Sequence, residues 1–187
     1  MKLHIKYMVS IRCKMIVKAE LQKLGLHYLS VDLGEIETME TLTTQQLIDF
    51  SKALQRSGLE LMDDKKAILI EKIKNIVVEM VHYADEFPKV KNSVYISERS
   101  GHNYTYLANL FSEATGTTIE HFIILQKIEK AKELIVYDEL SLSEIADRLG
   151  YSSVAHLSNQ FKKTTGLPPG KFRELGLPRR KPLDLVN

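Results

Sequence analysis

The segment YLANLFSEATG at Tyr106–Gly116 returns as HLSNQFKKTTG at His156–Gly166, a constant 50 residues further along the chain. The two copies share a leucine, an asparagine, a phenylalanine and a glycine at corresponding places. Upstream, with one residue inserted, ISERSG at Ile96–Gly101 corresponds to IADRLG at Ile145–Gly150. Such a repeat indicates that one structural unit is used twice.

Each copy is typical of a short helix, a turn at glycine and a longer helix, which is the helix-turn-helix unit. The turn favours glycine because glycine adopts positive φ at little cost. A small residue, Ser97 or Ala146, stands four positions before each turn glycine and lets the second helix pack closely across the first. In the second copy, Leu157 and Phe161 lie four residues apart and are expected to face that first helix.

A long helix is expected between the two copies, from about Ile119 to Tyr137. At 1.5 Å per residue, roughly 19 residues of helix span about 28 Å. This length is close to the ~34 Å between successive major-groove faces on one side of B-DNA. In DNA-binding helix-turn-helix units the second helix, called here the reading helix, lies in the major groove. The expected reading helices are about Tyr104–Ala114 and Ser153–Thr164. One chain is therefore expected to contact two adjacent turns of the duplex.

The segment SLSEIADRLGYSSVAHLSNQFKKTTGLPPGKFRE, at Ser141–Glu174, resembles the signature of the AraC-type (arabinose-regulator) transcription factors. The matching residues are Ile145-Ala146, Gly150-Tyr151, Phe161-Lys162-Lys163, Gly166, Pro169 and Phe172-Arg173. The resemblance covers roughly 85 residues and includes both copies in order and spacing.

This resemblance implies a sequence-specific transcriptional regulator in which two helix-turn-helix subdomains, joined by a long helix, read one face of double-stranded DNA. RNA polymerase is then an expected partner. Residues 1–87 depart from the sugar-binding barrel that such regulators often carry, so no sugar effector is implied.

The resemblance assigns the base-facing positions to the outward side of each reading helix. On the second helix these are Val154, Ala155, His156, Ser158 and Asn159; on the first they are Thr105, Tyr106, Ala108 and Asn109. Asparagine suits an adenine edge, valine and alanine suit a thymine methyl group, and serine bonds either kind of group. Guanine readout is not expected, because none of these positions holds arginine or lysine.

Three further residues are expected to act at the phosphate backbone or at the helix end. Ser153 can cap the second reading helix and leave its N-terminal amides facing a phosphate. Lys162 and Lys163 lie one turn beyond Asn159, where backbone phosphates are in reach. His156 is expected to contact a phosphate or only water.

Residues 1–62 alternate between strand-like and helix-like patterns. Leu3, Ile5 and Tyr7 alternate with polar residues, and a helix over 11–24 carries Ile11, Met15, Val17, Leu21 and Leu24. Strands at 29–33, 35–39 and 59–62 and a helix from Thr43 or Thr44 to Arg56 complete the order β-α-β-β-α-β. That order predicts a ferredoxin-like sandwich, an α+β domain ahead of an all-α domain. An exposed edge strand of its sheet can pair with a second copy, so a homodimer is a further hypothesis.

The first domain also resembles, less closely, the heavy-metal-associated domains, which carry M-x-C-x-x-C before the first helix, where two thiolates clamp a soft ion. Here the stretch Met8–Cys13 keeps the second cysteine and has Ser10 in place of the first. Cys13 is then either a small apolar residue on a helix or a weak metal ligand, completed by a second chain. No cofactor is expected.

The sequence predicts a ferredoxin-like domain at 1–62, a connecting helix and joint at 63–91, and a DNA-binding domain at 92–187 with units at 93–116 and 141–166. Asp63 or Asp64 is expected to cap the connecting helix, which ends before Pro88. Asp85–Ser93 is the expected joint between the two halves.

Composition narrows the class of protein. The chain has 187 residues, 44% of them hydrophobic and 27% charged, which is ordinary for a folded protein, and its single cysteine excludes an intrachain disulfide. No apolar run approaches the roughly 20 residues that span a bilayer. A cytoplasmic location without membrane contact is therefore expected.

Charge is distributed unevenly along the chain, although its net value is only +2. Ser112–Asp147 holds eight acidic residues against three lysines, and Gln160–Asn187 holds seven basic residues against two acidic ones. The basic segment is either a phosphate-facing edge or an ordinary solvated surface.

An enzyme is not expected. The six histidines form no H-x-x-x-H or H-E-x-x-H pattern, and the sequence holds no glycine-rich phosphate loop. The alternative from a different class is a metal- or protein-binding adaptor, in which the ferredoxin-like domain is the active part and the helical half only docks. Sequence-specific DNA binding by the intact protein separates the two hypotheses.

Overall fold

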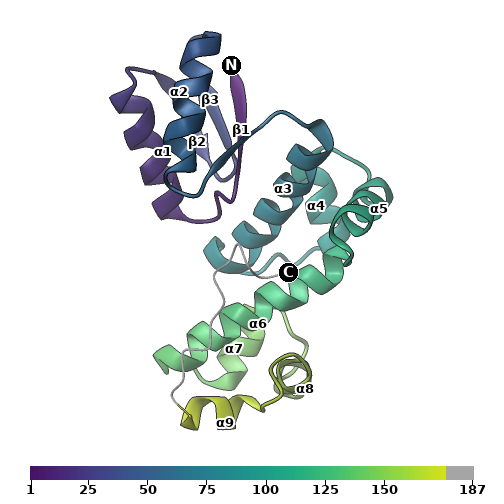
Figure 1. Cartoon of the computed structure of the whole chain (residues 1–187). Helices are drawn as coiled ribbons and strands as arrows, with labels where there is room; N and C mark the ends of the chain where they lie inside the picture. Colours follow the sequence, from purple (N-terminus) through teal and green to yellow (C-terminus); the bar gives the residue numbers. More distant parts are fainter. Residues whose placement is uncertain (176–187) are drawn as a thin grey trace. The chain divides into compact units, whose positions relative to one another are not determined.

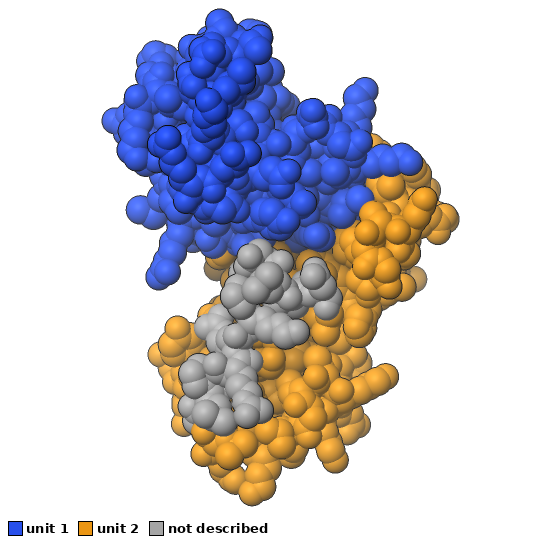
Figure 2. Space-filling view, in the orientation of Figure 1, with its two compact units in different colours: residues 1–75 blue, residues 76–187 orange. Residues whose placement is uncertain are grey.

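The computed structural model describes residues 1–175. The chain divides into two compact units, unit 1 covering residues 1–75 and unit 2 beginning at residue 76, and Figure 2 shows their described parts in blue and orange. The division falls inside helix α3 (Lys65–Val78). The basic residues Arg179, Arg180 and Lys181 of the C-terminal segment lie outside the described residues.

Unit 1 has the predicted order of strands and helices. Its elements are β1 (Lys2–Lys6), α1 (Ile11–Lys23), β2 (Tyr28–Asp32), β3 (Glu35–Thr38), α2 (Thr44–Gln55) and β4 (Glu60–Met62), followed by the first part of α3. The four strands form one antiparallel sheet in the order β2-β3-β1-β4 (Figure 1). The central strands are therefore β1 and β3, with Leu3 opposite Ile36 and Ile5 opposite Leu61.

The core of unit 1 joins the sheet to α1 and α2. Ile5 on β1 is fully buried, whereas its neighbour His4 is only half-buried, as the twofold alternation of a strand requires. Leu21 from α1 and Phe50 and Leu54 from α2 are fully buried in the same cluster. Each such side chain stabilises the fold by about 1.5–3 kcal/mol relative to its exposed state.

The apolar residues expected on α1 do not share one face, which corrects the sequence analysis. Val17 and Leu21 are buried, but Ile11 and Met15 are 61% and 65% exposed. Successive residues turn by about 100° in an α-helix, so Met15 and Val17, two apart, point about 200° away from each other. A face that buries Val17 must therefore expose Met15.

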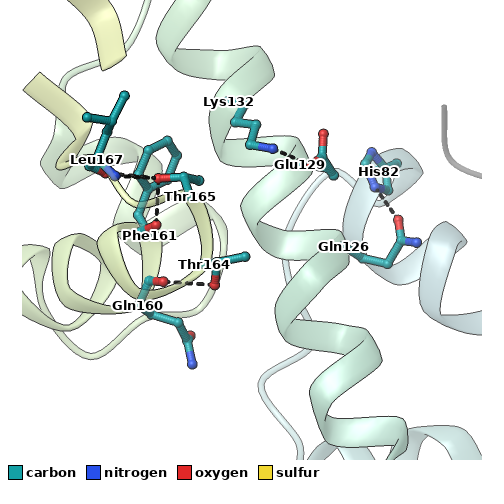
Figure 3. Close-up of polar contacts among 9 residues, drawn as sticks. All are labelled: His82, Gln126, Glu129, Lys132, Gln160, Phe161, Thr164, Thr165 and Leu167. Atoms are coloured by element: carbon teal, nitrogen blue, oxygen red, sulfur yellow. Dashed lines mark hydrogen bonds and ion pairs between the residues drawn. The ribbon is translucent and has the colours of Figure 1, made fainter. Parts of the chain in front are cut away.

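Helix α3 begins at the second of the two candidate caps, because Asp64 Oδ1 accepts a hydrogen bond of 2.7 Å from the Ala67 amide. Its continuation is a π-helical turn, η1 (Glu79–Tyr83), which the sequence did not predict. The chain leaves the helix at Ala84, before Pro88 as expected. Insertions of this kind re-aim side chains within a helix, and here His82 Nε2 lies 2.9 Å from Gln126 Oε1 (Figure 3).

Unit 2 is helical throughout its described part. Beyond η1 it contains α4 (Asn92–Ser100), α5 (Tyr104–Thr115), α6 (Ile119–Tyr137), α7 (Leu142–Arg148), α8 (Val154–Thr165) and α9 (Pro169–Glu174). The bounds of α6 are the predicted ones, and the two expected reading helices match α5 and α8 to within one residue. Figure 1 shows α4 and α5 near one end of α6 and α7–α9 near the other.

The stretch Asp85–Ser93, expected as the joint, lies inside unit 2, and the boundary between the units falls after Asn75. Charged residues make this stretch look like a linker, but Phe87 within it is half-buried. The ring of Phe87 lies under the Lys127 ammonium of α6, with 3.7 Å from Nζ to the ring centroid. This contact ties the loop to the helices that follow it.

Both turn glycines of the repeat adopt the positive φ that was predicted, +77° at Gly101 and +65° at Gly150. Their surroundings differ. A Cβ at Gly101 would meet nothing within 4 Å, whereas one at Gly150 would lie 2.6 Å from Phe87 Cδ1. Gly150 is therefore required both by the backbone conformation and by a close aromatic neighbour.

A pair of substitutions separates these two requirements. Gly116, which ends α5, also has a positive φ, +73°, and open space around its Cα. Gly116→Ala is expected to destabilise unit 2 by about 1 kcal/mol through backbone strain alone. Gly150→Ala adds the clash with Phe87 and is expected to cost about 2–4 kcal/mol in total. Urea unfolding of both variants measures the difference, and equal losses would contradict the role given to Phe87.

Candidate nucleic-acid interface

The two reading helices begin in the same way. Asn103 caps α5, and its side chain accepts a hydrogen bond of 2.9 Å from the Thr105 amide. Ser153 caps α8 and accepts one of 3.1 Å from the His156 amide, so its predicted capping role is confirmed. A cap of this kind stabilises a helix by about 1 kcal/mol.

They also end in the same way. At the end of α5, the Thr115 hydroxyl donates to the Phe111 carbonyl at 2.7 Å. At the end of α8, the Thr165 hydroxyl lies 2.8 Å from the Phe161 carbonyl and 2.9 Å from the Leu167 carbonyl and can donate its one proton to either (Figure 3). The 50-residue repeat therefore preserves hydrogen bonds as well as apolar positions.

The repeat extends further than the sequence analysis recognised. Phe111 packs on Phe122 with 5.7 Å between ring centroids, and Phe161 packs on Phe172 at 5.3 Å. Phe122 and Phe172 are again 50 residues apart. The same residue at these two positions is the sequence feature that indicates the longer repeat. Helix α9 thus occupies, in the second unit, the place of the first turns of α6 in the first.

The inward residues of α8 are the predicted ones, and α5 buries the corresponding pair. Leu107 and Phe111 on α5, and Leu157 and Phe161 on α8, have no exposed surface. Leu157 and Phe161 face a first helix, α7, whose Ile145 is also fully buried. The opposite side of each reading helix is consequently left for solvent or a partner.

All twelve candidate contact residues have surface available. Exposed are Thr105, Tyr106 and Asn109 on α5, and Ser153, Ala155, His156, Asn159, Lys162 and Lys163 at α8; half-buried are Ala108, Val154 and Ser158. The structure thus gathers them on two outward faces, one at α5 and one at α8, and buries none.

Several neighbours hold these faces in place. His156 Nδ1 lies 3.2 Å from the Ser152 hydroxyl, and its ring meets Tyr151 edge-on at 5.2 Å between centroids. On α5, the Tyr104 hydroxyl donates to the Glu120 carboxylate of α6. Burial, and then this carboxylate, raise the pKa of Tyr104 above its ordinary value, so the phenol stays neutral. Tyr104 thus helps to position α5 against α6, a role that no local sequence pattern indicates.

Positive charge on this surface is concentrated at the end of α8. Lys162 and Lys163 are exposed and form no ion pair within residues 1–175. By contrast, Arg173 pairs with Asp138 at 3.2 Å, and Lys171 pairs with Glu174 at 3.0 Å. The two lysines are therefore the cations beside the candidate base-facing residues that remain available to a phosphate.

The candidate metal ligand lies in unit 1, at the start of α1. Cys13 is half-buried, and its Sγ is 3.2 Å from Ser10 Oγ, which also caps the helix. Over residues 1–175 the structure contains no group of three or more histidine, cysteine or acidic side chains arranged to hold a metal ion. Within the same range, no helix combines the length and apolar character needed to span a membrane.

Comparison with known families identifies the helical part. Residues 96–175 match a family model described as a helix-turn-helix domain. The chain is 25% identical over 158 residues to the "Uncharacterized HTH-type transcriptional regulator YtdP" of Bacillus subtilis strain 168, which covers 80% of this chain and 20% of that protein. It is 35% identical over 69 residues to the xylose operon regulatory protein of Escherichia coli K12, covering 37% of this chain and 18% of that protein.

A solved structure has a similar fold. The C-terminal domain of AraT, a response regulator from Geobacillus stearothermophilus, aligns with a TM-score of 0.51 and 23% identity, over 64% of this chain and 92% of that one. The chain spans between 18% and 52% of the length of the first curated relatives it matches. Residues 96–175, which hold most of α4 and all of α5–α9, therefore form a helix-turn-helix domain.

Proposed function

We propose that this chain regulates transcription by binding a specific sequence in double-stranded DNA, with α5 and α8 in adjacent major grooves. The observation that carries the proposal is the pair of similarly capped helices, with outward polar faces, at the two ends of α6. The 19 residues of α6 span about 28 Å, close to the ~34 Å of one turn of B-DNA. Curated relatives are named as transcriptional regulators, which supports the same function.

The base-reading roles are part of this proposal. Asn159 and Asn109 are exposed at corresponding places of the repeat, and an asparagine amide can bond an adenine edge at two atoms. Val154 and Ala155 offer methyl groups to thymine, and Ser158 offers a hydroxyl. Thr105, Tyr106 and Ala108 are the equivalent readers on α5. Lys162 and Lys163 contact phosphates, and His156 contacts a phosphate or water.

The remaining partners are inferred from the function. A regulator of this type acts on RNA polymerase in the cytoplasm, where bacterial DNA is transcribed. Dimer formation would use unit 1. The edge strands of its sheet are β2 and β4, and each is paired with another strand along one side only. Leu29 on β2 is 63% exposed, so this edge offers apolar surface to a second copy.

We further infer that unit 1 is a ferredoxin-like domain related to the heavy-metal-associated type. The β-α-β-β-α-β order and the central position of β1 and β3 support this inference. So does the position of Ser10 beside Cys13, at the place where that family has two cysteines. One thiolate leaves the site incomplete, so unit 1 holds no metal of its own under this proposal.

Footprinting tests the proposed function. Binding sites are first selected from random duplexes with the full chain, and the chain is then footprinted on the best site. Two protected major-groove segments, about 10–11 base pairs apart on one face, are expected. Protection of one segment alone would show that α5 braces α8 and reads nothing. Failure to select any sequence would favour the adaptor hypothesis, in which unit 1 is the active part.

Alanine substitution at Asn159 tests base reading. Asn159→Ala is expected to weaken binding to the selected site by about 1–3 kcal/mol and to leave binding to scrambled DNA nearly unchanged, because a base contact carries the sequence information. Asn109→Ala removes the equivalent proposed reader of the first unit and is expected to cost less, since no lysine pair follows it on α5. Fluorescence anisotropy on both duplexes measures these losses. Equal losses for Asn159→Ala on the two duplexes would assign it a positioning role.

The lysine pair is expected to act without regard to sequence. Lys162→Ala or Lys163→Ala, where the side chain binds a phosphate, should weaken specific and scrambled binding alike. Removing one lysine–phosphate ion pair lowers the slope of log affinity against log salt by about 0.9. Anisotropy titrations across a salt series measure this slope. An unchanged slope for both variants would remove these lysines from the interface.

A cysteine substitution tests whether unit 1 is related to the heavy-metal-associated domains. The native protein is expected to bind copper(I) or zinc no more tightly than about micromolar, because one soft ligand is missing. Ser10→Cys supplies it 3.2 Å from the Cys13 sulfur and is expected to create a much tighter site. Competition with a chelator measures both affinities. Nanomolar binding by the native chain, lost in Cys13→Ala, would overturn the expectation.

A further inference from the structure

A groove of about 930 Å³ lies within unit 2, and none of the candidate DNA-contact residues of α5 and α8 lines it. The loop 85–92, the middle of α6 and the turn between α7 and α8 form its walls. Its charged lining residues are Asp85, Glu86, Lys89, Lys91, Lys127, Asp147 and Arg148. Six of these are exposed, and only Lys127 is buried. A space of this size accommodates a small organic molecule.

Lys127 is an unusual residue for such a position. Its side chain is buried on α6, where it forms no ion pair within the described chain. The ammonium instead lies over two aromatic rings, 3.7 Å from the Phe87 centroid and 5.1 Å from the Tyr151 centroid. Burial lowers the pKa of Lys127 to about 8, so at neutral pH its ammonium is mostly charged, and it forms no ion pair with a carboxylate of residues 1–175.

A second polar group in the same wall lacks a partner. Tyr151 is 8% exposed, and its hydroxyl makes no hydrogen bond within residues 1–175. A buried hydroxyl without a partner is destabilising relative to a bonded one, so such groups are rare unless a ligand satisfies them. The groove lining thus includes a cation that only aromatic rings contact and a tyrosine whose hydroxyl has no partner within residues 1–175, beside the apolar residues Phe87, Pro88 and Val90.

We propose that this groove binds a small organic carboxylate, which pairs with the Lys127 ammonium and accepts a hydrogen bond from the Tyr151 hydroxyl. The apolar part of the ligand packs against Phe87, Pro88 and Val90. The charged lining holds four cations against three carboxylates, so one carboxylate ligand balances the groove, whereas a phosphate dianion would leave an excess negative charge. The site is independent of the DNA-binding proposal, although its Tyr151 also packs on His156 of α8.

Benzoate is a suitable probe, with benzamide as its neutral counterpart of the same shape. The full chain, labelled with ¹³C at lysine, is titrated with each while the Lys127 ε-methylene signal is followed by NMR. Saturable benzoate binding with a Kd below about 1 mM is expected, with benzamide at least about tenfold weaker. Bound benzoate should also raise the pKa of Lys127 from about 8, because an adjacent anion favours the ammonium form.

Substitutions identify the two ligand contacts. Lys127→Met removes the charge at similar length, so it should weaken benzoate at least about tenfold without lowering Tm, since an unpaired buried charge is lost. Tyr151→Phe removes only the hydroxyl and should weaken benzoate by about three- to tenfold. Lys130→Met is the matched control on α6, because Lys130 pairs with Glu133 at 3.0 Å and does not line the groove.

Three results would overturn the proposal. The first is the absence of saturable benzoate binding up to about 20 mM, a weak limit for a built site. The second is equal benzoate affinity in the native chain and in Lys127→Met. The third is tighter binding of inorganic phosphate than of benzoate, which would reject the carboxylate class.

Discussion

The helical unit depends on the burial of α6 from several sides at once. The helix contacts η1, α5, α7, α8 and α9, and eleven of its 19 residues are buried. Neither helix-turn-helix unit has a sufficient core alone, because each consists of short helices with a single apolar side. Phe122 near the start of α6 completes the first unit by packing on Phe111. Further along, α6 contacts the helices of the second unit, so both reading helices are held by one rigid element.

The two units solve the same packing problem with the same chemistry. Each reading helix has a side-chain cap at its start, a threonine bonded to a carbonyl one turn back at its end, and a glycine at positive φ beyond it. In each unit, the phenylalanine of the reading helix packs on a second phenylalanine. Both phenylalanines of the second unit lie 50 residues after their equivalents in the first unit. What differs is the outward face, where the lysine pair follows Asn159 but not Asn109. Packing is thus kept similar while the surface that meets DNA varies.

Burial on several sides also places polar residues of α6 inside the unit. Glu129 and Lys132 satisfy each other through an ion pair, and Gln126 is bonded to His82 of η1 (Figure 3). A buried ion pair adds little stability over an apolar pair, but removal of one partner strongly destabilises the fold because the other charge stays buried without compensation. Lys127 is different, because aromatic rings are its neighbours and a groove lies beside it. The middle of α6 is therefore both a structural support and the wall of a candidate ligand site.

The sequence by itself determined the local features: the repeat, the helix bounds, the positive φ at the turn glycines and the outward position of the candidate DNA contacts. These follow from periodicity and from backbone preferences that act within a few residues. Only the tertiary structure decided the exposure of Met15, the π-helical turn before Ala84 and the packing of Phe87 beneath Lys127. The sequence also did not predict that Lys127 and Tyr151 line one groove, because they are 24 residues apart and on different elements. Such contacts depend on which surfaces the folded chain brings together, and no local pattern encodes them.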